Sequence, residues 1–244
     1  MPKISVVIPC YFNEGNIPVT VAALLKNEKG FSSDVTFEYV FVDDGSQDGT
    51  LRELRNFHEK YPSRIKVIEL SKNVGSYSAI CAGFEYCSGN CIVVISADLQ
   101  DPPELIKEMY NNWLSGSKLT LGVRERRNDP FLTKVFAEFF YTALGICGLS
   151  NVPKGGFDFC LFDHSLLGKI KSRMRPGINS LLLLLQVGET PSVILYTRRK
   201  REIGQSQWTF TNKLKLALNT LSYFLLKKTG TETKPYTIKQ AYGV

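Results

Sequence analysis

The stretch CIVVISADLQDPPELI, residues 91–106, decides the fold. Its apolar run, Ile92–Ile95, has the length and composition of a strand buried inside a sheet. Oxygen-bearing side chains follow the run at once, at Asp98, Gln100 and Asp101. In open α/β sheets, ligands bind at the carboxyl ends of the strands. The stretch therefore predicts a buried strand that delivers these oxygens to a binding site.

Upstream of this stretch, apolar strands alternate with helices. The predicted strands lie at 4–9, at the start of 37–50, at 65–71 and at 91–97, and the predicted helices lie at 17–28, 51–62 and 76–87. This order, with nearly continuous apolar strands, is typical of a parallel sheet covered by helices on both faces. Polar clusters follow Pro9, Val42, Leu70 and Ala97. We therefore expect four loops to meet at one edge of the sheet.

The rest of the chain is less regular. We expect a strand leading to a basic loop at 117–129, an amphipathic segment at 131–146, a glycine-led strand at 155–163, an apolar helix at 178–188, a strand running into a basic loop at 192–208 and an amphipathic helix at 210–228. The tail from Thr229 is polar and is expected to be loose.

Composition and charge limit the possible functions of the chain. The chain has 244 residues, of which 43% are hydrophobic and 22% charged, as expected for one globular domain. Its net charge of +7 indicates an anionic partner: nucleic acid, a phosphorylated small molecule or an anionic membrane. No apolar run reaches the roughly 18 residues that span a bilayer. With no signal-peptide pattern and with cysteines inside apolar runs, a cytoplasmic location is expected.

Asp98 and Gln100 are candidate metal ligands. Side chains two residues apart in a turn can point the same way, and their oxygens are hard ligands suited to Mg²⁺ or Mn²⁺. Such an ion takes its remaining ligands from water and substrate phosphates. Alternatively, Asp98 caps a helix that starts near Pro102. Asp101 is better placed for that cap, which leaves Asp98 for the metal.

Two further loops carry side chains suited to a nucleotide. Asp43 and Asp44 end an apolar run, where consecutive carboxylates are costly unless they bind something. Their oxygens could accept hydrogen bonds from a base N–H or a ribose hydroxyl. In the first loop, Tyr11 offers a ring for stacking on a base, and Glu14 offers an acceptor. All four residues are expected at the same sheet edge as Asp98.

Five motifs together resemble one enzyme family. They are VVIPCYFNEGNI at 6–17, VDDGSQDGT at 42–50, SKNVGSYSAI at 71–80, ADLQDPPELI at 97–106 and GGFDFCLFD at 155–163. In this order and spacing they resemble the family 2 glycosyltransferases, closest to the branch of dolichol- or polyprenyl-phosphate sugar transferases and bacterial polysaccharide enzymes. The resemblance covers about residues 3–225. It implies the GT-A fold, a three-layer α/β fold with a mostly parallel central sheet, and a nucleotide-sugar bound through Mg²⁺ or Mn²⁺.

The resemblance also implies roles for individual residues. Those that would bind the nucleotide-sugar are Pro9, Tyr11, Glu14, Asp43, Asp44 and Asp98. Asp98 and Gln100 would hold the metal on the diphosphate. The catalytic pair would be Arg124 and Asp158, and the contacts to phosphate or acceptor would be Lys134, Arg199, Arg201 and Ser206. Asp158 would take the proton of a sugar hydroxyl, or would orient a lipid phosphate, which needs no base.

The implied activity is inverting transfer of a sugar from a UDP- or GDP-linked donor. The acceptor would be a polyprenyl phosphate, or a lipid-linked or free saccharide, in cell-surface polysaccharide biosynthesis. The implied organisation is a catalytic domain at 1–208, an amphipathic helix at 209–228 and a polar tail at 229–244. The amphipathic segments could dock at the inner face of the cell membrane through lysines such as Lys213, Lys215, Lys227 and Lys228. The alternatives are a packed core face and a homo-oligomer interface.

Three features depart from the family pattern. Ser96 stands where the family often has the first acid of D-A-D, and Cys160 stands where it has an arginine. Lipid-phosphate members commonly carry C-terminal transmembrane helices, and none is found in this sequence, so the chain is either part of a longer protein or acts peripherally on a lipid-linked or soluble acceptor. The substitutions keep an alternative open: a catalytically weak nucleotide-sugar-binding protein of the same fold.

Two other classes fit the sequence poorly. A dinucleotide-dependent oxidoreductase would need G-x-G-x-x-G after the first strand, where this chain reads PCYFNEGN. A nucleic-acid-binding protein would expose basic and aromatic residues together. The clearest loops here are acidic, so no nucleic-acid partner is expected.

Overall fold

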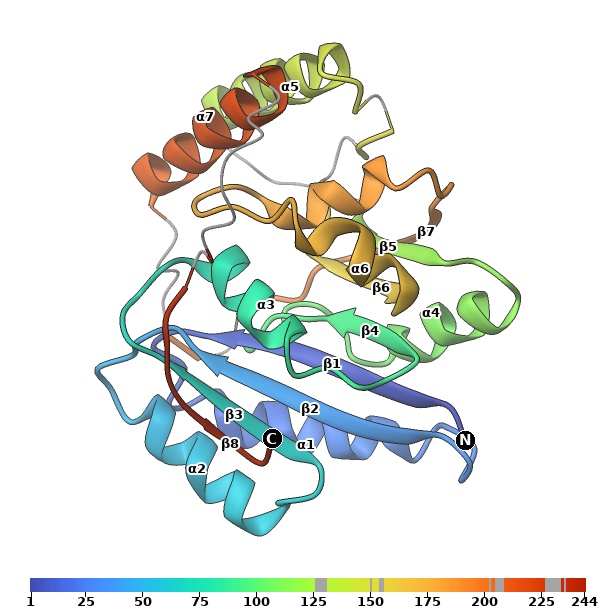
Figure 1. Ribbon diagram of the computed structural model, residues 1–244, viewed down its shortest axis with the longest axis vertical. Helices are drawn as coiled ribbons and strands as arrows, with labels where there is room; N and C mark the ends of the chain where they lie inside the picture. Colours follow the sequence, from blue (N-terminus) through green and yellow to red (C-terminus); the bar gives the residue numbers. More distant parts are fainter. Residues whose placement is uncertain are drawn as a thin grey trace.

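The computed structural model of the protein describes residues 1–125, 131–149, 151–153, 156–201, 203–204, 209–226, 234 and 236–244, with the backbone alone at 131–137 and 210. In these residues, helices pack on both faces of one central sheet (Figure 1). The first half of the chain follows the predicted alternation. Its elements are β1 (Lys3–Cys10), α1 (Ile17–Glu28), β2 (Thr36–Asp43), α2 (Thr50–Lys60), β3 (Ile65–Leu70), α3 (Ser76–Phe84), β4 (Cys91–Val94) and α4 (Leu105–Leu114).

The second half departs from the prediction in three places. Its elements are β5 (Leu119–Arg124), α5 (Phe131–Ile146), β6 (Phe159–Asp163), α6 (Ser165–Lys171), the 3₁₀ helix η1 (Ser180–Gln186), β7 (Ser192–Tyr196), α7 (Phe210–Leu226) and β8 (Ile238–Tyr242). The apolar run expected as an α-helix at 178–188 is the 3₁₀ helix, and α6 was not expected. The expectation of a loose tail is wrong for its last residues, since β8 pairs with β3.

The strand order of the sheet is β7-β5-β6-β4-β1-β2-β3-β8. Neighbours β4, β1, β2 and β3 are all parallel, as the sequence predicts. Strand β6 runs antiparallel to both β4 and β5, and β8 runs antiparallel to β3. The sheet is therefore mostly parallel: β5 and β7 run in the same direction as β4, β1, β2 and β3, whereas β6 and β8 run antiparallel to them.

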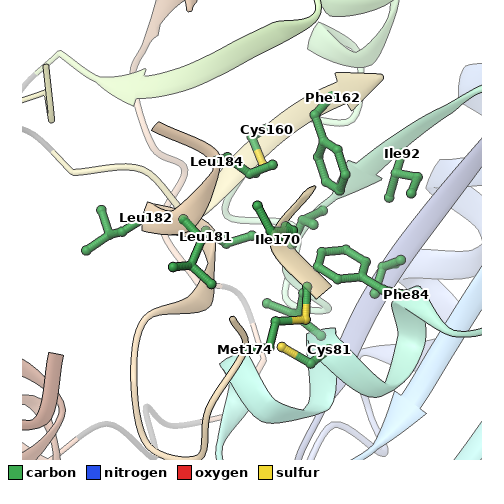
Figure 2. Packing of buried hydrophobic residues seen from close by; sticks show 14 of the residues in the cluster. Cys81, Phe84, Ile92, Cys160, Phe162, Ile170, Met174, Leu181, Leu182 and Leu184 are labelled. Carbon is green, nitrogen blue, oxygen red and sulfur yellow. The ribbon is translucent and has the colours of Figure 1, made fainter. Parts of the chain in front are cut away.

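Apolar side chains fill both faces of the sheet, because successive residues of a strand point to opposite sides. Val7 belongs to a cluster with α3, α6 and η1, whereas its neighbour Ile8 belongs to a cluster with α1 and α4. Figure 2 shows the first cluster, in which Phe84 and Phe162 meet edge to face at 5.4 Å between ring centroids. The same cluster contains Cys160, which is fully buried, and the six cysteines are all free.

Helices α5 and α7 lie side by side beyond α6 and η1 (Figure 1). They are anchored by Leu144 and Phe224, which are buried in the core cluster of α3 and α6. The two helices carry exposed large apolar residues: Phe139, Ile146, Leu214, Leu218, Leu225 and Leu226. Within the described residues, no helix is both long and apolar enough to cross a bilayer.

Candidate active site

The loops that follow the parallel strands meet at their carboxyl ends, as expected. The backbone N–H of Phe12 donates to Ser46 Oγ at 3.1 Å, and that of Asn13 donates to Thr50 Oγ1 at 2.7 Å. These bonds join the loop after β1 to the loop after β2. The loop after β4 meets the segment after β7, where the N–H of Arg199 donates to the carbonyl of Gln100 at 2.9 Å. Residues from β1, β2, β4 and β7 thus share one edge.

Asp43, the last residue of β2, is buried and has one oxygen without a partner. Its Oδ2 accepts the backbone N–H of Ser46 at 3.3 Å. Its Oδ1 is buried and has no hydrogen-bond partner within the described residues. Burial, the largest cause, raises the pKa of Asp43 to about 6. A buried acceptor of this kind favours a ligand that brings a hydrogen-bond donor.

Asp44 differs from its neighbour because both of its oxygens are used. Oδ1 accepts the N–H of Val74 at 2.7 Å, and Oδ2 accepts the N–H of Gly75 at 2.9 Å. Burial raises the pKa of Asp44 to about 7, although these two hydrogen bonds oppose the rise. Asp44 therefore holds the loop between β3 and α3, a role that the sequence reading did not separate from nucleotide contact.

Glu14 likewise braces a loop. Its Oε2 accepts the N–H of Gly49 at 3.0 Å, and its Oε1 pairs with Arg52 at 2.6 Å. A Cβ at position 49 would stand 2.1 Å from Glu14 Oε1, so a larger residue there would displace this carboxylate. Tyr11 is half-buried beside this loop, with its ring edge-to-face against Phe12. Pro9, the remaining predicted contact of the first loop, is half-buried in β1 opposite Val42 of β2.

Asp98 is the most contacted of the predicted metal ligands. Its Oδ1 accepts from Ser96 Oγ at 2.8 Å and from the N–H of Gln100 at 3.2 Å, and its Oδ2 pairs with Arg201 at 2.6 Å. The amide nitrogen of Gln100 donates to the carbonyl of Arg199 at 3.1 Å. Among the described residues, no three His, Cys, Asp or Glu side chains gather as a metal cage. One carboxylate, one amide oxygen and substrate phosphates suit Mg²⁺ or Mn²⁺, so these residues fit such an ion.

Asp101 does not cap the following helix, contrary to expectation. Helix α4 begins at Leu105, and Asp101 is fully buried. Its carboxylate accepts from Tyr196 Oη at 2.5 Å, and it lies 2.7 Å from Ser96 Oγ and 3.4 Å from Arg198. Asp101 therefore fastens the segment after β7 to the loop after β4.

Arg124 and Asp158 form the predicted catalytic pair at the other side of this edge. Arg124 Nη2 donates to Asp158 Oδ2 at 2.9 Å. Although burial acts in the opposite direction, Asp158 and Asp101 raise the pKa of Arg124. Tyr77, which the sequence reading missed, donates to Asp158 Oδ1 at 2.7 Å. The only signal was its place in the motif at 71–80.

The structure describes only some of the remaining predicted contacts to phosphate or acceptor. Arg199 is half-exposed and pairs with Glu104 at 3.0 Å, beside Asp98. The side chain of Lys134 and all of Ser206 lie outside the described residues. Tyr196 and Arg198, like Tyr77, belong to the site edge and were not among the predicted site residues.

Solved structures share this fold. A mannosyltransferase from Pyrobaculum calidifontis, in complex with GDP-Man and Mn²⁺, matches with a TM-score of 0.59 at 17% identity, over 96% of this chain and 66% of that one. Glucosyl-3-phosphoglycerate synthase from Mycobacterium tuberculosis, in complex with Mn²⁺, UDP and glucosyl-3-phosphoglycerate, matches with a TM-score of 0.59 at 16% identity, over 97% and 86%. The fold is that of the GT-A glycosyltransferases.

Sequence comparison gives the family. Residues 5–171 match the model described as Glycosyl transferase family 2. An uncharacterized glycosyltransferase of Synechocystis sp. is 34% identical over 230 residues, which cover 92% of this chain and 70% of the relative. A prophage bactoprenol glucosyl transferase homolog of Escherichia coli is 28% identical over 223 residues, which cover 91% and 72%. The chain belongs to glycosyl transferase family 2 and is a glycosyltransferase.

Proposed function

We propose that this glycosyltransferase transfers a sugar, with inversion, from a nucleoside diphosphate to a polyprenyl phosphate. The observation that carries the proposal is the placement of three different groups along one sheet edge. They are the buried oxygen of Asp43, which has no partner among the described residues, the carboxylate of Asp98 and the guanidinium of Arg124. These groups suit, in turn, a nucleoside, a diphosphate with its metal, and an anionic acceptor.

The nucleoside would lie against the loops after β1 and β2. Asp43 Oδ1 would accept a hydrogen bond from a base N–H or a ribose hydroxyl, which would satisfy a buried atom that has no partner in the part of the chain that the structure describes. Tyr11 would stack on the base. Asp44 and Glu14 would hold the two loops in place from behind.

The diphosphate would lie between Asp98 and the segment after β7. Asp98 and Gln100 would hold Mg²⁺ or Mn²⁺, which would neutralise charge on the leaving diphosphate. Arg201 and Arg199 approach the same loop, so a guanidinium released from Asp98 would stand next to the phosphates. Lys134 and Ser206 remain proposed phosphate contacts.

The acceptor is proposed to be a phosphate because relatives of this chain are named bactoprenol glucosyl transferases. An oxygen of that phosphate would bond to the anomeric carbon as the bond from this carbon to the diphosphate breaks. The nucleoside diphosphate leaves with the electron pair, and attack from the opposite side inverts the carbon. A phosphate is already an anion, so no base is required, and Arg124 would bind it. With a saccharide hydroxyl as acceptor, Asp158 would be the base.

The lipid would approach from the inner face of the cell membrane. Helices α5 and α7 expose Phe139, Leu218 and Leu225, and Lys213 and Lys215 are exposed on α7. An apolar face with nearby lysines suits an anionic lipid surface. We propose that residues 1–208 are the catalytic unit and that α7 contributes to this docking surface.

The test is a transfer assay with the purified chain, Mn²⁺, UDP-glucose or GDP-mannose, and a polyprenyl phosphate in detergent. We expect a lipid-linked sugar, detected by mass spectrometry, with the anomeric configuration opposite to that of the donor. Binding of nucleotide without transfer to the polyprenyl phosphate or to any saccharide acceptor would instead favour the catalytically weak binding protein. Transfer to a saccharide alone would replace the proposed acceptor.

A further inference from the structure

The carboxylate of Asp158 is held at two points by side chains from two other elements. Tyr77 Oη, in the first turn of α3, donates to Oδ1 at 2.7 Å, and Arg124 Nη2, at the end of β5, donates to Oδ2 at 2.9 Å. Asp158 itself lies just before β6, and its side chain is 49% exposed, whereas that of Arg124 is 13% exposed. The carboxylate therefore bridges a phenol and a guanidinium at the acceptor side of the site.

The position of Tyr77 is fixed by the loop that precedes it. Helix α3 begins at Ser76 after Gly75, whose φ of 89° favours glycine. Asp44 accepts the backbone N–H groups of Val74 and Gly75, so a buried carboxylate holds the start of the helix. The rest of α3 is buried against the sheet. The phenol thus projects from a rigid element.

The phenol of Tyr77 is suited to be a permanent donor. Burial, followed by the carboxylate of Asp158, raises its pKa well above the ordinary value. It therefore stays protonated and keeps donating to Asp158 across the pH range of an enzyme assay. A tyrosine that is half-buried and bonded to a carboxylate has little freedom to turn toward solvent.

We propose that Tyr77 is a positioning residue that fixes the Asp158–Arg124 pair so that the guanidinium faces the acceptor phosphate. The inference rests on the proposed function and adds a residue to it. Asp158 cannot bind a phosphate directly, because both groups are anionic. Its use is to orient Arg124, and an exposed carboxylate with a single partner would orient it less firmly. Tyr77 supplies the second point of attachment.

The arrangement also joins the two ends of the site. Asp44, on the proposed nucleotide side, accepts the backbone N–H of Gly75. Tyr77, two residues after Gly75, donates to Asp158. The acceptor pair is therefore aligned by the same loop that closes the nucleotide side. Loss of the phenol hydroxyl should disturb the acceptor end alone, because Asp44 keeps its bonds to the loop.

The test compares Tyr77→Phe with Tyr236→Phe. Tyr236 is a matched control because burial and the carboxylate of Glu85, which lies at the end of α3 away from Tyr77, likewise raise the pKa of its phenol. Calorimetry with Mn²⁺ and UDP measures the nucleotide side, and calorimetry with farnesyl phosphate measures the acceptor side. We expect Tyr77→Phe to weaken farnesyl phosphate binding and to raise the acceptor KM by about tenfold, with UDP binding changed less than about twofold. Tyr236→Phe should leave all three unchanged.

Each other outcome overturns the inference. If Tyr77→Phe binds farnesyl phosphate and turns over like the wild type, Tyr77 has no positioning role, although the proposed function stands. If Tyr77→Phe loses UDP binding to the same extent as phosphate binding, its role is structural. If the wild-type chain binds UDP but not farnesyl phosphate, the proposed acceptor is wrong and this role is lost with it.

Discussion

The part of the sheet formed by β4, β1, β2 and β3 and the part formed by β6, β5 and β7 build their sides of the site differently. In the first, loops are tied by backbone bonds to buried carboxylates, as when Asp44 accepts Val74 and Gly75. In the second, several contacts are pairs of partly exposed side chains, such as Arg199 with Glu104, although Tyr196 of β7 makes a buried bond to Asp101. Water weakens pairs of the second kind. We therefore expect the proposed nucleotide side to be preformed and the proposed acceptor side to rearrange more easily.

The largest effect is expected where the two parts meet, at Asp98, which follows β4 and pairs with Arg201 after β7. Asp98→Ala removes the only carboxylate among the proposed metal ligands, so transfer with Mn²⁺ should fall by about a hundredfold or more. The rate is measured with saturating donor, and thermal unfolding checks the fold. Asp34→Ala, at an exposed aspartate, is the control. Full activity of the Asp98 variant would remove the metal assignment.

The second prediction concerns Asp43, whose replacement should weaken nucleotide binding but raise stability at neutral pH. Asp43→Asn weakens an acceptor for the nucleoside, so UDP or GDP should bind about tenfold more weakly in calorimetry. The folded-state pKa of Asp43, about 6, is raised by burial above the usual 3.8. The native wild type therefore binds more protons than the unfolded chain between about pH 4 and 6, and its stability falls as pH rises through that window.

The asparagine variant lacks this titration, so it should be more stable than the wild type above pH 6, by about 1–3 kcal/mol. Urea unfolding at pH 4.5 and pH 7 measures the difference, which should be larger at pH 7. Asp34→Asn, at an exposed site, should change neither binding nor stability. Equal stability of Asp43→Asn and wild type at both pH values would show that burying this carboxylate costs nothing.

The two parts of the sheet also differ in how much of their structure the sequence predicts. The strands around β1, the parallel order and the meeting of the loops at 11–14, 43–44 and 98–100 follow from local apolar runs and from the rule that ligands bind at carboxyl edges. The leucine run at 181–185 could not be assigned from periodicity, because an apolar residue at every position fits α and 3₁₀ helices alike.

Side-chain partners were harder to predict than loops. The sequence predicts Asp98 and Arg201 as separate site residues. Their pairing joins residues 103 positions apart and depends on where β7 lies in the sheet. Tyr77 and Asp158 are 81 positions apart, and a tyrosine in an apolar helix resembles a core residue. Strand β8 has no apolar pattern that predicts a strand. It is ordered by its pairing with β3, which the sequence does not show.

A smaller effect is expected when the ion pair between Asp98 and Arg201, which joins the two parts of the sheet, is broken at Arg201. Arg201→Gln removes the cation that compensates Asp98, so Mn²⁺ should bind about fivefold more tightly in the absence of nucleotide. Transfer should fall by only about threefold to tenfold, because Asp98 is retained. Electron paramagnetic resonance of free Mn²⁺ measures the binding. Arg64→Gln breaks a comparable pair with Glu28 at the opposite edge and should leave Mn²⁺ binding unchanged. Weaker Mn²⁺ binding by Arg201→Gln would contradict competition between the two cations.

The smallest effect on transfer is expected at the amino edge of the sheet, where Glu38 serves stability alone. The buried carboxylate contacts Lys3 at 2.7 Å, Lys66 at 3.0 Å and the N–H of Ser88 at 2.6 Å. Burial alone would raise its pKa, but these partners lower it to about 2. Because the folded-state pKa lies below the usual 4.5, the stabilisation is present above that pH and is lost as pH falls toward 2.

Glu38→Gln should therefore lower the free energy of unfolding by about 2–3 kcal/mol at pH 7, and the difference from wild type should shrink in acid. Transfer measured below the unfolding temperature should remain within about twofold of wild type, because the residue lies at the edge away from Asp98. Glu59→Gln, at an exposed helix position, should change neither quantity. A large loss of transfer in folded Glu38→Gln would mean that the amino edge also supports the site, and the contrast between a preformed nucleotide side and an adaptable acceptor side would have to include the sheet itself.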